Sequence, residues 1–221
     1  MERLQLDDES NIEIISKDDS AIYRLLKRFL DIVLSSIGLV ILSPVLLIVA
    51  ILIKLESKGP AFYSHKRLGK NREYINLYKF RSMHENSKEI FETFTEEQKK
   101  EYYENFKLEN DPRVTKIGNF IRKTSIDELP QLINVIKGDM SLVGPRPIVE
   151  DEVIKYGQYA DKFFSVIPGV TGYWQANGRS DTTYDERVQM DMYYIDNRSL
   201  IMDFKIVLDT VVSVIRKEGA M

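Results

Sequence analysis

A long apolar run near the N-terminus dominates the pattern of hydrophobic and polar positions. Residues 1–20 are polar and acidic and form no apolar face, so we expect residues 1–21 to be a flexible acidic tail. From Phe29 to Ile53 the chain is mostly apolar, and this run exceeds the ~20 residues with which a helix crosses a bilayer. The run is too long for a signal peptide, and no small-residue cleavage site follows it. The pattern therefore predicts a membrane segment.

The middle of this run is interrupted by Ser43-Pro44. Proline lacks a helical N–H and its ring clashes with the carbonyl four residues earlier, so a kink or break is expected there. Ser43 could donate a hydrogen bond to one of the carbonyls that the break leaves free. Basic residues flank the run on both sides: Arg24, Lys27 and Arg28 before it, and Lys54, Lys58, Lys66, Arg67 and Lys70 after it.

Because basic flanks favour the cytoplasm, both ends of the run are predicted to lie on the cytoplasmic side. This favours a re-entrant helix-break-helix over residues 22–58, which enters the membrane, bends at Ser43-Pro44 and leaves on the same side. Two alternatives stay open, namely a single helix that spans the membrane and a buried hairpin in a soluble protein.

From Gly59 onward the pattern becomes that of an α/β domain, mostly helical with short strands. Two strands are predicted at residues 61–64 and 74–78, joined by a basic turn that contains Gly69. Helices are predicted over residues 85–107, 131–136, 150–164 and about 200–217, and another begins at 117. We expect residues 59–221 to form one cytosolic domain.

The last predicted helix carries an apolar stripe at helical spacing, formed by Leu200, Phe204, Val207, Leu208, Val211, Val214 and Ile215. Such a stripe is typical of a helix packed on an ordinary core. It also suits an amphipathic helix in the membrane interface, or a helix that packs against a second subunit in a homodimer.

The composition of the chain limits the binding partners and metal sites that can be expected. The net charge of −3 provides no basic excess for binding nucleic acid, and 29% charged residues argues against a protein with many membrane helices. The chain has no cysteine, which excludes disulfides and thiolate metal sites, and only two histidines, which makes a multi-histidine zinc site unlikely in one chain. A divalent metal would have to be bound by oxygen ligands, which points to Mg²⁺ or Mn²⁺.

The segment from Ser125 to Pro130 holds the densest group of chemically useful residues. In one interpretation Ser125 caps a helix and Glu128 completes a capping box. If Pro130 is instead the first helical residue, its missing N–H costs nothing, and Asp127 and Glu128 lie just before the N-terminus. Two adjacent carboxylates can then divide their roles, one binding a divalent metal while the other attacks phosphorus.

Two arginines lie in predicted turns, Arg146 in Gly144-Pro-Arg-Pro147 and Arg179 at the end of the segment from Gly172. The planar guanidinium suits phosphate oxygens. Trp174 could stack on a base or ring, although a single tryptophan is more often part of a core. There is no Walker glycine-lysine loop and no Gly-x-Gly-x-x-Gly, so P-loop and dinucleotide-binding folds lack support.

The ordered set of motifs resembles the bacterial sugar transferase family, the monotopic phosphoglycosyl transferases that begin undecaprenyl-linked glycan assembly. The resemblance covers roughly residues 24–221. It is carried by Lys27-Arg-Phe-Leu-Asp31, Leu42-Ser-Pro44, Lys66-Arg-Leu-Gly69, Tyr78-Lys-Phe-Arg-Ser-Met83, Asp111-Pro-Arg113, Arg122-Lys-Thr-Ser-Ile-Asp-Glu-Leu-Pro-Gln131, Lys137-Gly-Asp-Met-Ser-Leu-Val-Gly-Pro-Arg-Pro147, Pro168-Gly-Val-Thr-Gly172 and Gln175-Ala-Asn-Gly-Arg179.

The resemblance implies a catalytic domain on the cytoplasmic face of the bacterial inner membrane. It implies that Asp127 attacks the sugar-linked phosphorus of a UDP-sugar, releases UMP and holds a phosphosugar that undecaprenyl phosphate then accepts. Glu128 would bind Mg²⁺. The resemblance also implies substrate-binding roles for Lys66, Arg122, Arg146 and Arg179.

Residues 185–194 and the ending Arg216-Lys-Glu-Gly-Ala-Met221 look more like the branch that transfers hexose-1-phosphate from UDP-galactose or UDP-glucose. This points to the first membrane step of exopolysaccharide, capsule or O-antigen synthesis. Longer relatives carry several membrane helices ahead of this domain, so the chain resembles their catalytic unit. The alternative is a non-catalytic membrane adaptor that organises glycosyltransferases through the last helix.

Overall fold

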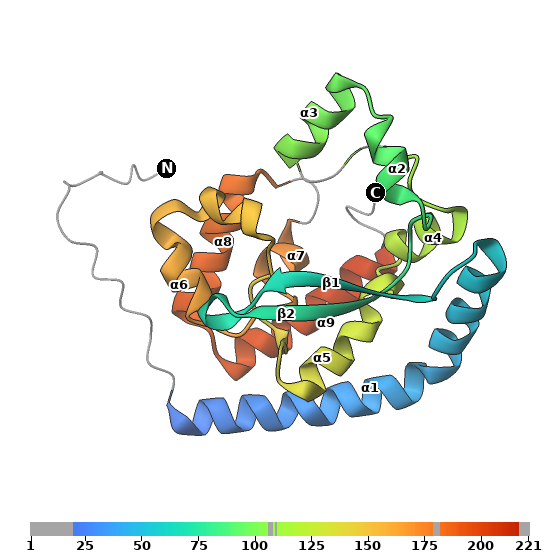
Figure 1. Cartoon of the computed structure of the whole chain (residues 1–221). Helices are drawn as coiled ribbons and strands as arrows, with labels where there is room; N and C mark the ends of the chain where they lie inside the picture. Colours follow the sequence, from blue (N-terminus) through green and yellow to red (C-terminus); the bar gives the residue numbers. More distant parts are fainter. Residues whose placement is uncertain (1–19, 106–107, 109, 179–181, 217–221) are drawn as a thin grey trace.

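The computed structural model describes residues 20–105, 108, 110–178 and 182–216, so the tail expected at residues 1–21 lies almost wholly outside the described part. A long helix runs beneath a domain of shorter helices and two small sheets (Figure 1). The predicted class, mostly helical with short strands, is confirmed. The helices are α1 (Ala21–Glu56), α2 (Ser87–Glu92), α3 (Glu96–Asn105), α4 (Lys116–Lys123), α5 (Leu132–Lys137), α6 (Ala160–Phe164), α7 (Tyr173–Asn177), α8 (Tyr184–Asn197) and α9 (Leu200–Arg216). The 3-10 segments are η1 (Lys70–Arg72), η2 (Ile126–Gln131) and η3 (Glu150–Tyr159), and the strands are β1 (Phe62–Leu68), β2 (Tyr74–Phe80), β3 (Ser141–Val143) and β4 (Gly169–Thr171).

The helix α1 continues through Pro44, so the break predicted there is a bend within one helix (Figure 1). Pro44 lacks the N–H that would pair with the carbonyl of Val40. The Oγ of Ser43 donates to that carbonyl at 2.8 Å, as the sequence suggested. The hydroxyl thus replaces the missing backbone bond, and this explains why the helix bends without ending. Among the described residues, α1 is the one helix long and apolar enough to cross a membrane.

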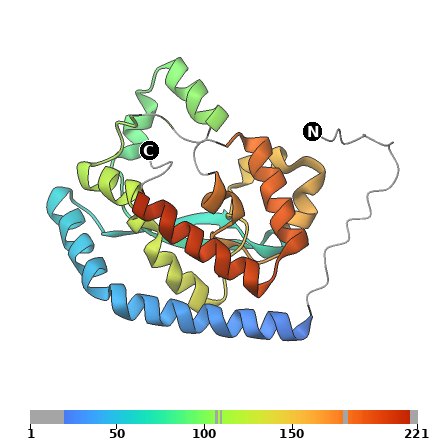
Figure 2. The same cartoon turned by 180° about the vertical axis from the view of Figure 1, so that it is seen from behind.

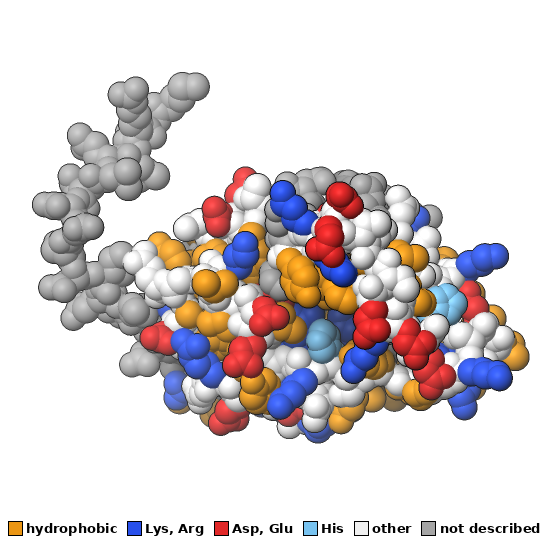
Figure 3. Space-filling model, turned by 45° about the horizontal axis from the view of Figure 1, so that its top comes forward, with side chains coloured by type: hydrophobic (Ala, Val, Ile, Leu, Met, Phe, Trp, Pro, Cys, Tyr) orange, Lys and Arg blue, Asp and Glu red, His pale blue; other side chains and the backbone are white. Residues whose placement is uncertain are grey.

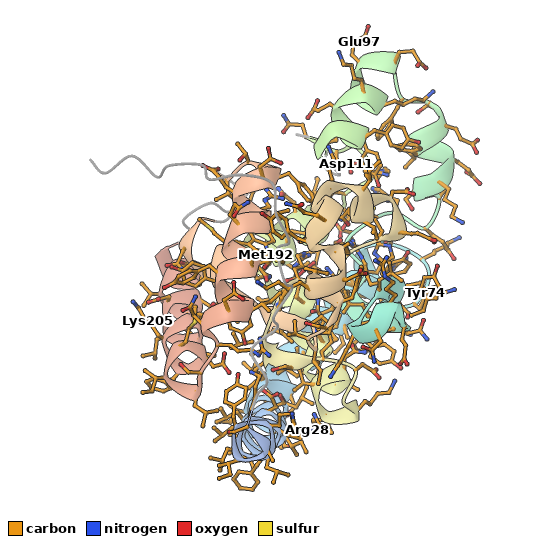
Figure 4. All side chains as sticks on the ribbon, turned by 90° about the vertical axis from the view of Figure 1, so that its left-hand side faces the viewer. Arg28, Tyr74, Glu97, Asp111, Met192 and Lys205 are labelled. Carbon is orange, nitrogen blue, oxygen red and sulfur yellow. The ribbon has the colours of Figure 1, made fainter. Side chains whose placement is uncertain are left out.

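The first half of α1 is attached to the domain by polar contacts. The buried carboxylate of Asp31 accepts a hydrogen bond from the backbone N–H of Leu142 at 3.0 Å. The ammonium of Lys27 lies 2.7 Å from the carboxylate of Asp203 on α9. The guanidinium of Arg28 donates to two carbonyls in the last turn of α5, at 2.6 and 2.8 Å (Figure 4). These groups lie on one stripe, so the domain covers the polar side of this half.

The second half of α1 is attached by apolar packing. Val49 and Ile53 are buried against Ala61, Phe80 and Ile121. Both halves therefore contact the same domain, although the bend lies between them. The outward side of the helix is apolar and exposed. Its residues with exposed fractions between 62% and 78% are Ile22, Leu25, Phe29, Val40, Ile41, Leu47 and Leu55.

The strands β1 and β2 form the predicted antiparallel hairpin, with Phe62 opposite Phe80 at one end and Leu68 opposite Tyr74 at the other. Both strands are longer than expected. In the turn, Asn71 has a φ of 55°, a value that asparagine tolerates better than most residues. Because side chains alternate along a strand, the odd-numbered residues share one face of the hairpin. That face carries Tyr63, His65, Arg67, Ile75, Leu77 and Lys79.

The parallel pair β3 and β4 was not predicted from the sequence, because each strand has only three residues. It holds the Gly144-Pro-Arg-Pro147 turn, which follows β3, against the start of β4. A Cβ on Gly169 would lie 2.1 Å from the backbone nitrogen of Gly144. Only glycine permits this approach, so the turn that carries Arg146 is fixed by contact between backbones.

The predicted helix at residues 85–107 is two helices, α2 and α3, which form an arm (Figure 1). The guanidinium of Arg113 lies 4.9–5.2 Å from the ring centroids of Phe91, Phe94 and Tyr102. The carboxylate of Asp111 accepts hydrogen bonds from the same guanidinium at 2.7–3.0 Å. Asp111 lies between the arm and the body in Figure 4. The aromatic side chains of this arm thus pack on a cation.

The helices α8 and α9 complete the domain around its largest apolar core. Phe163, Met192 and Ile195 lie in this core, and Figure 4 places Met192 near the centre of the molecule. The helix α8 was not predicted, although Thr183 and Glu186 form a capping box at its start.

The interpretation of the α9 stripe as ordinary core is wrong for much of its length. Phe204, Leu208 and Val211 are 65%, 49% and 50% exposed, while Asp203 and Ile206 face inward. The physical reason is the buried polar contact that Asp203 makes with Lys27 of α1, which fixes the orientation of the helix. Figure 2 shows α9 running across the back of the domain above α1.

Candidate active site

Asp127 and Glu128 lie in η2, a 3-10 turn that leads directly into α5. Ser125 enters this turn with a φ of 55° and its side chain makes no capping hydrogen bond, so the capping box is not formed. Pro130 lies inside the turn, two residues before α5 begins at Leu132, and the expectation that it starts the helix is wrong. The fixed φ of Pro130 suits the turn, and its missing N–H removes one backbone hydrogen bond from it.

Glu128 is held between two cations from different elements. The Nζ of Lys79 on β2 and a terminal nitrogen of Arg146 each donate to its Oε1 at 2.7 Å. The second terminal nitrogen of Arg146 reaches its Oε2 at 3.3 Å. Burial opposes ionisation of this carboxyl, but the charges of Arg146 and Lys79 outweigh it and lower the pKa of Glu128 well below its usual value. Glu128 is therefore a fixed anion at every physiological pH.

Asp127 is 9% exposed, and its surroundings act on its ionisation in the opposite direction to those of Glu128. Burial, and then the negative charge of Glu128, raise the pKa of Asp127 to about 6. Neighbouring carboxyl groups whose pKa values are pushed apart are typical of catalytic pairs with separate roles. Asp127 is ionised at neutral pH, but its anion is poorly stabilised. It is thus a stronger base and nucleophile than an ordinary aspartate.

Arg122 of α4 is the third cation next to this pair, and its charge acts to lower the pKa of Asp127. Its Nε donates to the Oγ of Ser82 at 2.8 Å. The position of α4 depends on Gly118, because a Cβ there would lie 1.9 Å from the carbonyl oxygen of Ser82. Lys79, Arg122 and Arg146 form what we call the cation cluster. Figure 3 shows a hollow in the surface with Lys and Arg side chains and a histidine around its floor.

The odd-numbered face of the hairpin adds further groups. A terminal nitrogen of Arg67 donates to Glu152 of η3 at 2.8 Å. His65 is half-buried beside it. Burial, and then the charges of Arg67, Lys79 and Arg146, lower the pKa of His65 to about 4. His65 is therefore uncharged at neutral pH and lies in the field of three cations.

Of the remaining predicted site residues, Lys66 is not brought to this cluster, and the position of Arg179 is not described. Lys66 is exposed on the even-numbered face of the hairpin, where its ammonium lies 3.8 Å from the centroid of the Tyr74 ring. Tyr74 is on the side of the molecule away from Lys205 of α9 in Figure 4. Arg179 lies outside the described residues. Near it, Trp174 is partly buried with the guanidinium of Arg187 4.7 Å from its ring centroid.

The sequence pattern of the family described as bacterial sugar transferase matches residues 22–217. This match spans nearly all of the described structure and every residue of the cluster. The chain belongs to the bacterial sugar transferase family. The relatives of this chain differ in how much of their own length it matches. The undecaprenyl-phosphate galactose phosphotransferase of Salmonella typhimurium is 46% identical over 200 residues, which cover 89% of this chain and 42% of that protein.

Two further relatives have different lengths. The UDP-glucose:undecaprenyl-phosphate glucose-1-phosphate transferase of Escherichia coli is 42% identical over 202 residues, covering 87% of this chain and 40% of that protein. The exopolysaccharide production protein ExoY of Rhizobium meliloti is 42% identical over 197 residues, covering 88% of this chain and 87% of that protein. The chain thus spans less than half of the two larger transferases and most of ExoY.

In this sugar transferase, four of the residues named from sequence lie together: Arg122, Asp127, Glu128 and Arg146. Sequence reasoning missed Lys79, Arg67 and His65 as site groups. The signal was present, because alternation along two strands places these three on one face. Choosing that face over the one with Lys66 requires the register of the hairpin, which the sequence pattern does not supply.

The expected Mg²⁺ can be tested against the donor atoms of the site. No group of three or more His, Cys, Asp or Glu side chains that could hold a metal occurs within the described residues. The carboxylates of Asp127 and Glu128 nevertheless fit the usual mode of Mg²⁺, which takes one or two carboxylates together with substrate phosphates. The Oε2 of Glu128 carries only the longer bond from Arg146, so it has a lone pair to give.

Proposed function

We propose that the chain transfers a sugar-1-phosphate from a UDP-sugar to undecaprenyl phosphate and releases UMP, at the first membrane step of exopolysaccharide, capsule or O-antigen synthesis. The observation that carries the proposal is Asp127, a buried carboxylate with a raised pKa beside the fixed anion Glu128 and the cation cluster. Relatives named for galactose and glucose transfer to undecaprenyl phosphate support it.

In the first step, a carboxylate oxygen of Asp127 attacks the sugar-linked phosphorus of the UDP-sugar. The bond from that phosphorus to the bridging oxygen breaks, and UMP leaves with the bonding electrons. The cation cluster supplies N–H donors for the phosphate oxygens, whose charge would otherwise repel an anionic nucleophile. Glu128 holds Lys79 and Arg146 in place for this task, since both donate to it at 2.7 Å.

In the second step, a phosphate oxygen of undecaprenyl phosphate attacks the same phosphorus. The bond to Asp127 breaks, the carboxylate is restored, and the product is a sugar-diphosphate lipid. The raised pKa of Asp127 strengthens the carboxylate as a nucleophile in the first step. In the second step Asp127 still leaves as a carboxylate anion at neutral pH, because its pKa of about 6 lies below 7.

Mg²⁺ would supply positive charge to the diphosphate oxygens and to the leaving UMP. Glu128 would hold it together with the substrate phosphates, through the Oε2 that Arg146 contacts at 3.3 Å. The cation cluster neutralises the remaining charge. Transfer is then expected to stop when a chelator removes Mg²⁺, and to resume when Mg²⁺ is restored.

We also propose that α1 is re-entrant, with both ends and the domain on the cytoplasmic face of the bacterial inner membrane. The support is that both halves of the helix contact one domain, through Asp31 and Lys27 on one side of the bend and through Ile53 on the other. A helix that crossed ~30 Å of hydrocarbon would carry one half away from that domain. The exposed positions of α9 suit either the membrane interface or a second subunit in a homodimer.

The sugar is proposed to be galactose or glucose. Residues 185–194, whose pattern suggested the hexose-1-phosphate branch, form most of α8, and the relatives quoted above act on both sugars by name. The adaptor alternative gives no role to the arrangement in which Asp127, with its raised pKa, lies beside Glu128 and the cation cluster.

The test is to follow UMP release from a panel of UDP-sugars with undecaprenyl phosphate and Mg²⁺. We expect release from UDP-galactose or UDP-glucose, and a loss of at least a thousandfold in Asp127→Asn. Asp161→Asn, which changes an exposed aspartate on α6, is the matched control and should keep full activity. Full activity in Asp127→Asn would remove the nucleophile from the proposal, and no release from any UDP-sugar would favour the adaptor.

A further inference from the structure

The side chain of His65 differs from its charged neighbours because it makes no side-chain hydrogen bond within the described part of the chain. Within the described residues, neither ring nitrogen of His65 has a hydrogen-bond partner, although Arg67, Lys79 and Arg146 surround it. Each of these cations is held by a carboxylate, Arg67 by Glu152 and the other two by Glu128. The imidazole is half-buried, and the charges of Arg67, Lys79 and Arg146 act on it.

The donors and acceptors of the site are unbalanced for a sugar nucleotide. Lysine and arginine only donate hydrogen bonds, and phosphate oxygens only accept them, so the cation cluster matches the diphosphate. Sugar hydroxyls also carry protons that need acceptors. In the proposed reaction Asp127 bonds to phosphorus, and the Oε2 of Glu128 is the atom left for Mg²⁺. The Oε1 of Glu128 already accepts hydrogen bonds from Lys79 and Arg146. The carboxylate of Glu152 accepts from Arg67 and from the hydroxyl of Tyr184.

An uncharged imidazole supplies the missing acceptor. One ring nitrogen accepts while the other donates, which is the combination that a hydroxyl group requires. The positive surroundings keep the ring in this form, because protonation would add a fourth charge next to Arg67, Lys79 and Arg146. The same surroundings disfavour an imidazolium at this position in the free protein.

We propose that His65 is a specificity residue that hydrogen-bonds a hydroxyl of the sugar in the donor UDP-sugar. This inference rests on the proposed function, since it assigns a contact within that reaction. His65 lies on the odd-numbered face of the hairpin, two residues along β1 from Arg67 and opposite Leu77, the strand neighbour of Lys79. Lys79 and Arg146, whose charges act on His65, also contact Glu128, the chain neighbour of Asp127, so His65 lies close to the groups proposed to bind the diphosphate.

The competing explanation is that His65 only packs on the hairpin. A structural role would lower activity with every ligand alike. A contact with a sugar hydroxyl would weaken only ligands that carry the sugar, and would alter the ratio between sugars that differ at that hydroxyl. The binding of UMP, which lacks the sugar, separates the two explanations without requiring turnover.

The experiment uses the full chain in detergent or nanodiscs and compares wild type with His65→Ala and His65→Gln. For each variant, kcat/KM is measured with UDP-galactose, UDP-glucose and their singly deoxygenated sugar analogues, and UMP binding is measured by calorimetry. His84→Gln changes the other histidine of the chain and serves as the control.

We expect His65→Ala to lower kcat/KM for the preferred UDP-sugar by about tenfold, the loss of one hydrogen bond, with UMP affinity unchanged within about twofold. His65→Gln should recover part of this loss. One deoxy analogue should react equally with wild type and His65→Ala. The proposal is overturned if UMP affinity falls in parallel with kcat/KM, or if wild type and His65→Ala discriminate equally between all sugars. If wild type releases no UMP from any UDP-sugar, the proposed function fails and this inference fails with it.

Discussion

Asp127 and Glu128 are neighbours in the chain, yet their surroundings push their pKa values in opposite directions. Glu128 accepts two charged donors at 2.7 Å, whereas Asp127 is buried next to the charge of Glu128. The difference comes from the 3-10 turn, in which successive side chains point about a third of a turn apart. One carboxylate therefore organises the cations while the other keeps its reactivity.

The pKa of Asp127 predicts the acid limb of the pH profile. The nucleophile must be ionised, and burial together with Glu128 raises the pKa of Asp127 to about 6. We expect kcat/KM for the UDP-sugar to be constant between about pH 7 and 8 and to fall about tenfold per pH unit well below pH 6. Stopped-flow or discontinuous UMP assays across this range measure it. A profile that stays flat down to pH 4.5 would contradict the electrostatic state assigned to Asp127.

The raised pKa of Asp127 also predicts how the free energy of unfolding depends on pH. A buried carboxyl whose pKa is raised in the fold destabilises it above pH 6, where the group is ionised in both states, and has no such effect below the ordinary pKa near 4. Asp127→Asn should thus raise the free energy of unfolding by about 1–3 kcal/mol at pH 7.5. Thermal unfolding in one detergent at pH 7.5 and pH 4 measures the difference, which should disappear at the lower pH.

At this scale, sequence reasoning located Asp127, Glu128, Arg122 and Arg146, since each belongs to a motif with few alternative roles. It selected Lys66 from the basic stretch and missed Lys79. The choice depends on which hairpin face meets η2, and that is set by the register and by the packing of β2, not by residue type. The run of basic residues in the sequence identified the stretch, but only the three-dimensional structure identified Lys79 as the residue that contacts Glu128.

Among the elements, α1 shows why a pattern of hydropathy can hide a docking surface. Asp31 lies near one end of the apolar run, where a single charge is tolerable, but its carboxylate is buried against β3. The polar residues on the side of α1 that faces the domain, such as Lys27, are too few to interrupt the apolar run in the sequence. Periodicity therefore predicted the existence and length of the helix, and even the contact of Ser43, but not the side that faces the domain.

Replacing Asp31 tests this docking. Asp31→Ala leaves the backbone N–H of Leu142 without its acceptor, and a buried unpaired donor costs about 1–3 kcal/mol. Asp31→Asn keeps an acceptor oxygen and should cost less. Comparison of the two midpoints of thermal unfolding gives the difference. Equal midpoints for wild type and Asp31→Ala would show that α1 does not depend on this contact.

The junction of β3 and β4 makes a second prediction. Gly169→Ala places a methyl group 2.1 Å from the backbone of Gly144, so the turn that carries Arg146 must shift. We expect UMP release to fall by at least a hundredfold, because Arg146 loses its contact with Glu128. Gly38→Ala is the matched control, since its Cβ would lie 3.4 Å from a flexible Leu132 side chain. Normal activity in Gly169→Ala would show that the turn is not fixed by this contact.

These short strands, and the helix α8, account for most of what the sequence did not predict. A strand such as β3, with three residues, has no periodicity to detect, and it is defined by pairing with β4 across a long stretch of chain. The α9 stripe was assigned to the core because it is apolar. Its inward side is instead set by Asp203, which pairs with a lysine on a distant helix.

In the whole molecule, the bend in α1 and its two attachments to the domain fix the position of the active site relative to the apolar side of this helix. The apolar outward side of α1 faces away from the domain, and the cation cluster lies within the domain above it. A soluble nucleotide sugar and a lipid phosphate could then reach Asp127 from different directions. The arrangement depends on both ends of α1 lying on one side of the membrane.

Cysteine labelling in intact spheroplasts and inverted vesicles tests that arrangement, since the chain has no native cysteine. Ala21→Cys and Lys58→Cys, one at each end of α1, should both react with an impermeant maleimide only from the cytoplasmic side. Val40→Cys, exposed near the bend, is the control and should react only after detergent is added. Labelling of the two ends from opposite sides would establish a spanning helix instead.

The central claim, that Asp127 carries the phosphosugar, is tested most directly by intact-mass spectrometry of the purified chain. The chain is incubated with Mg²⁺ and the active UDP-sugar in the absence of undecaprenyl phosphate. The account predicts a mass increase of one phosphohexose, about one UMP released per chain, and loss of both in Asp127→Asn. Adding undecaprenyl phosphate should remove the adduct. UMP release that requires both substrates together, with no adduct at any time, would contradict the covalent mechanism.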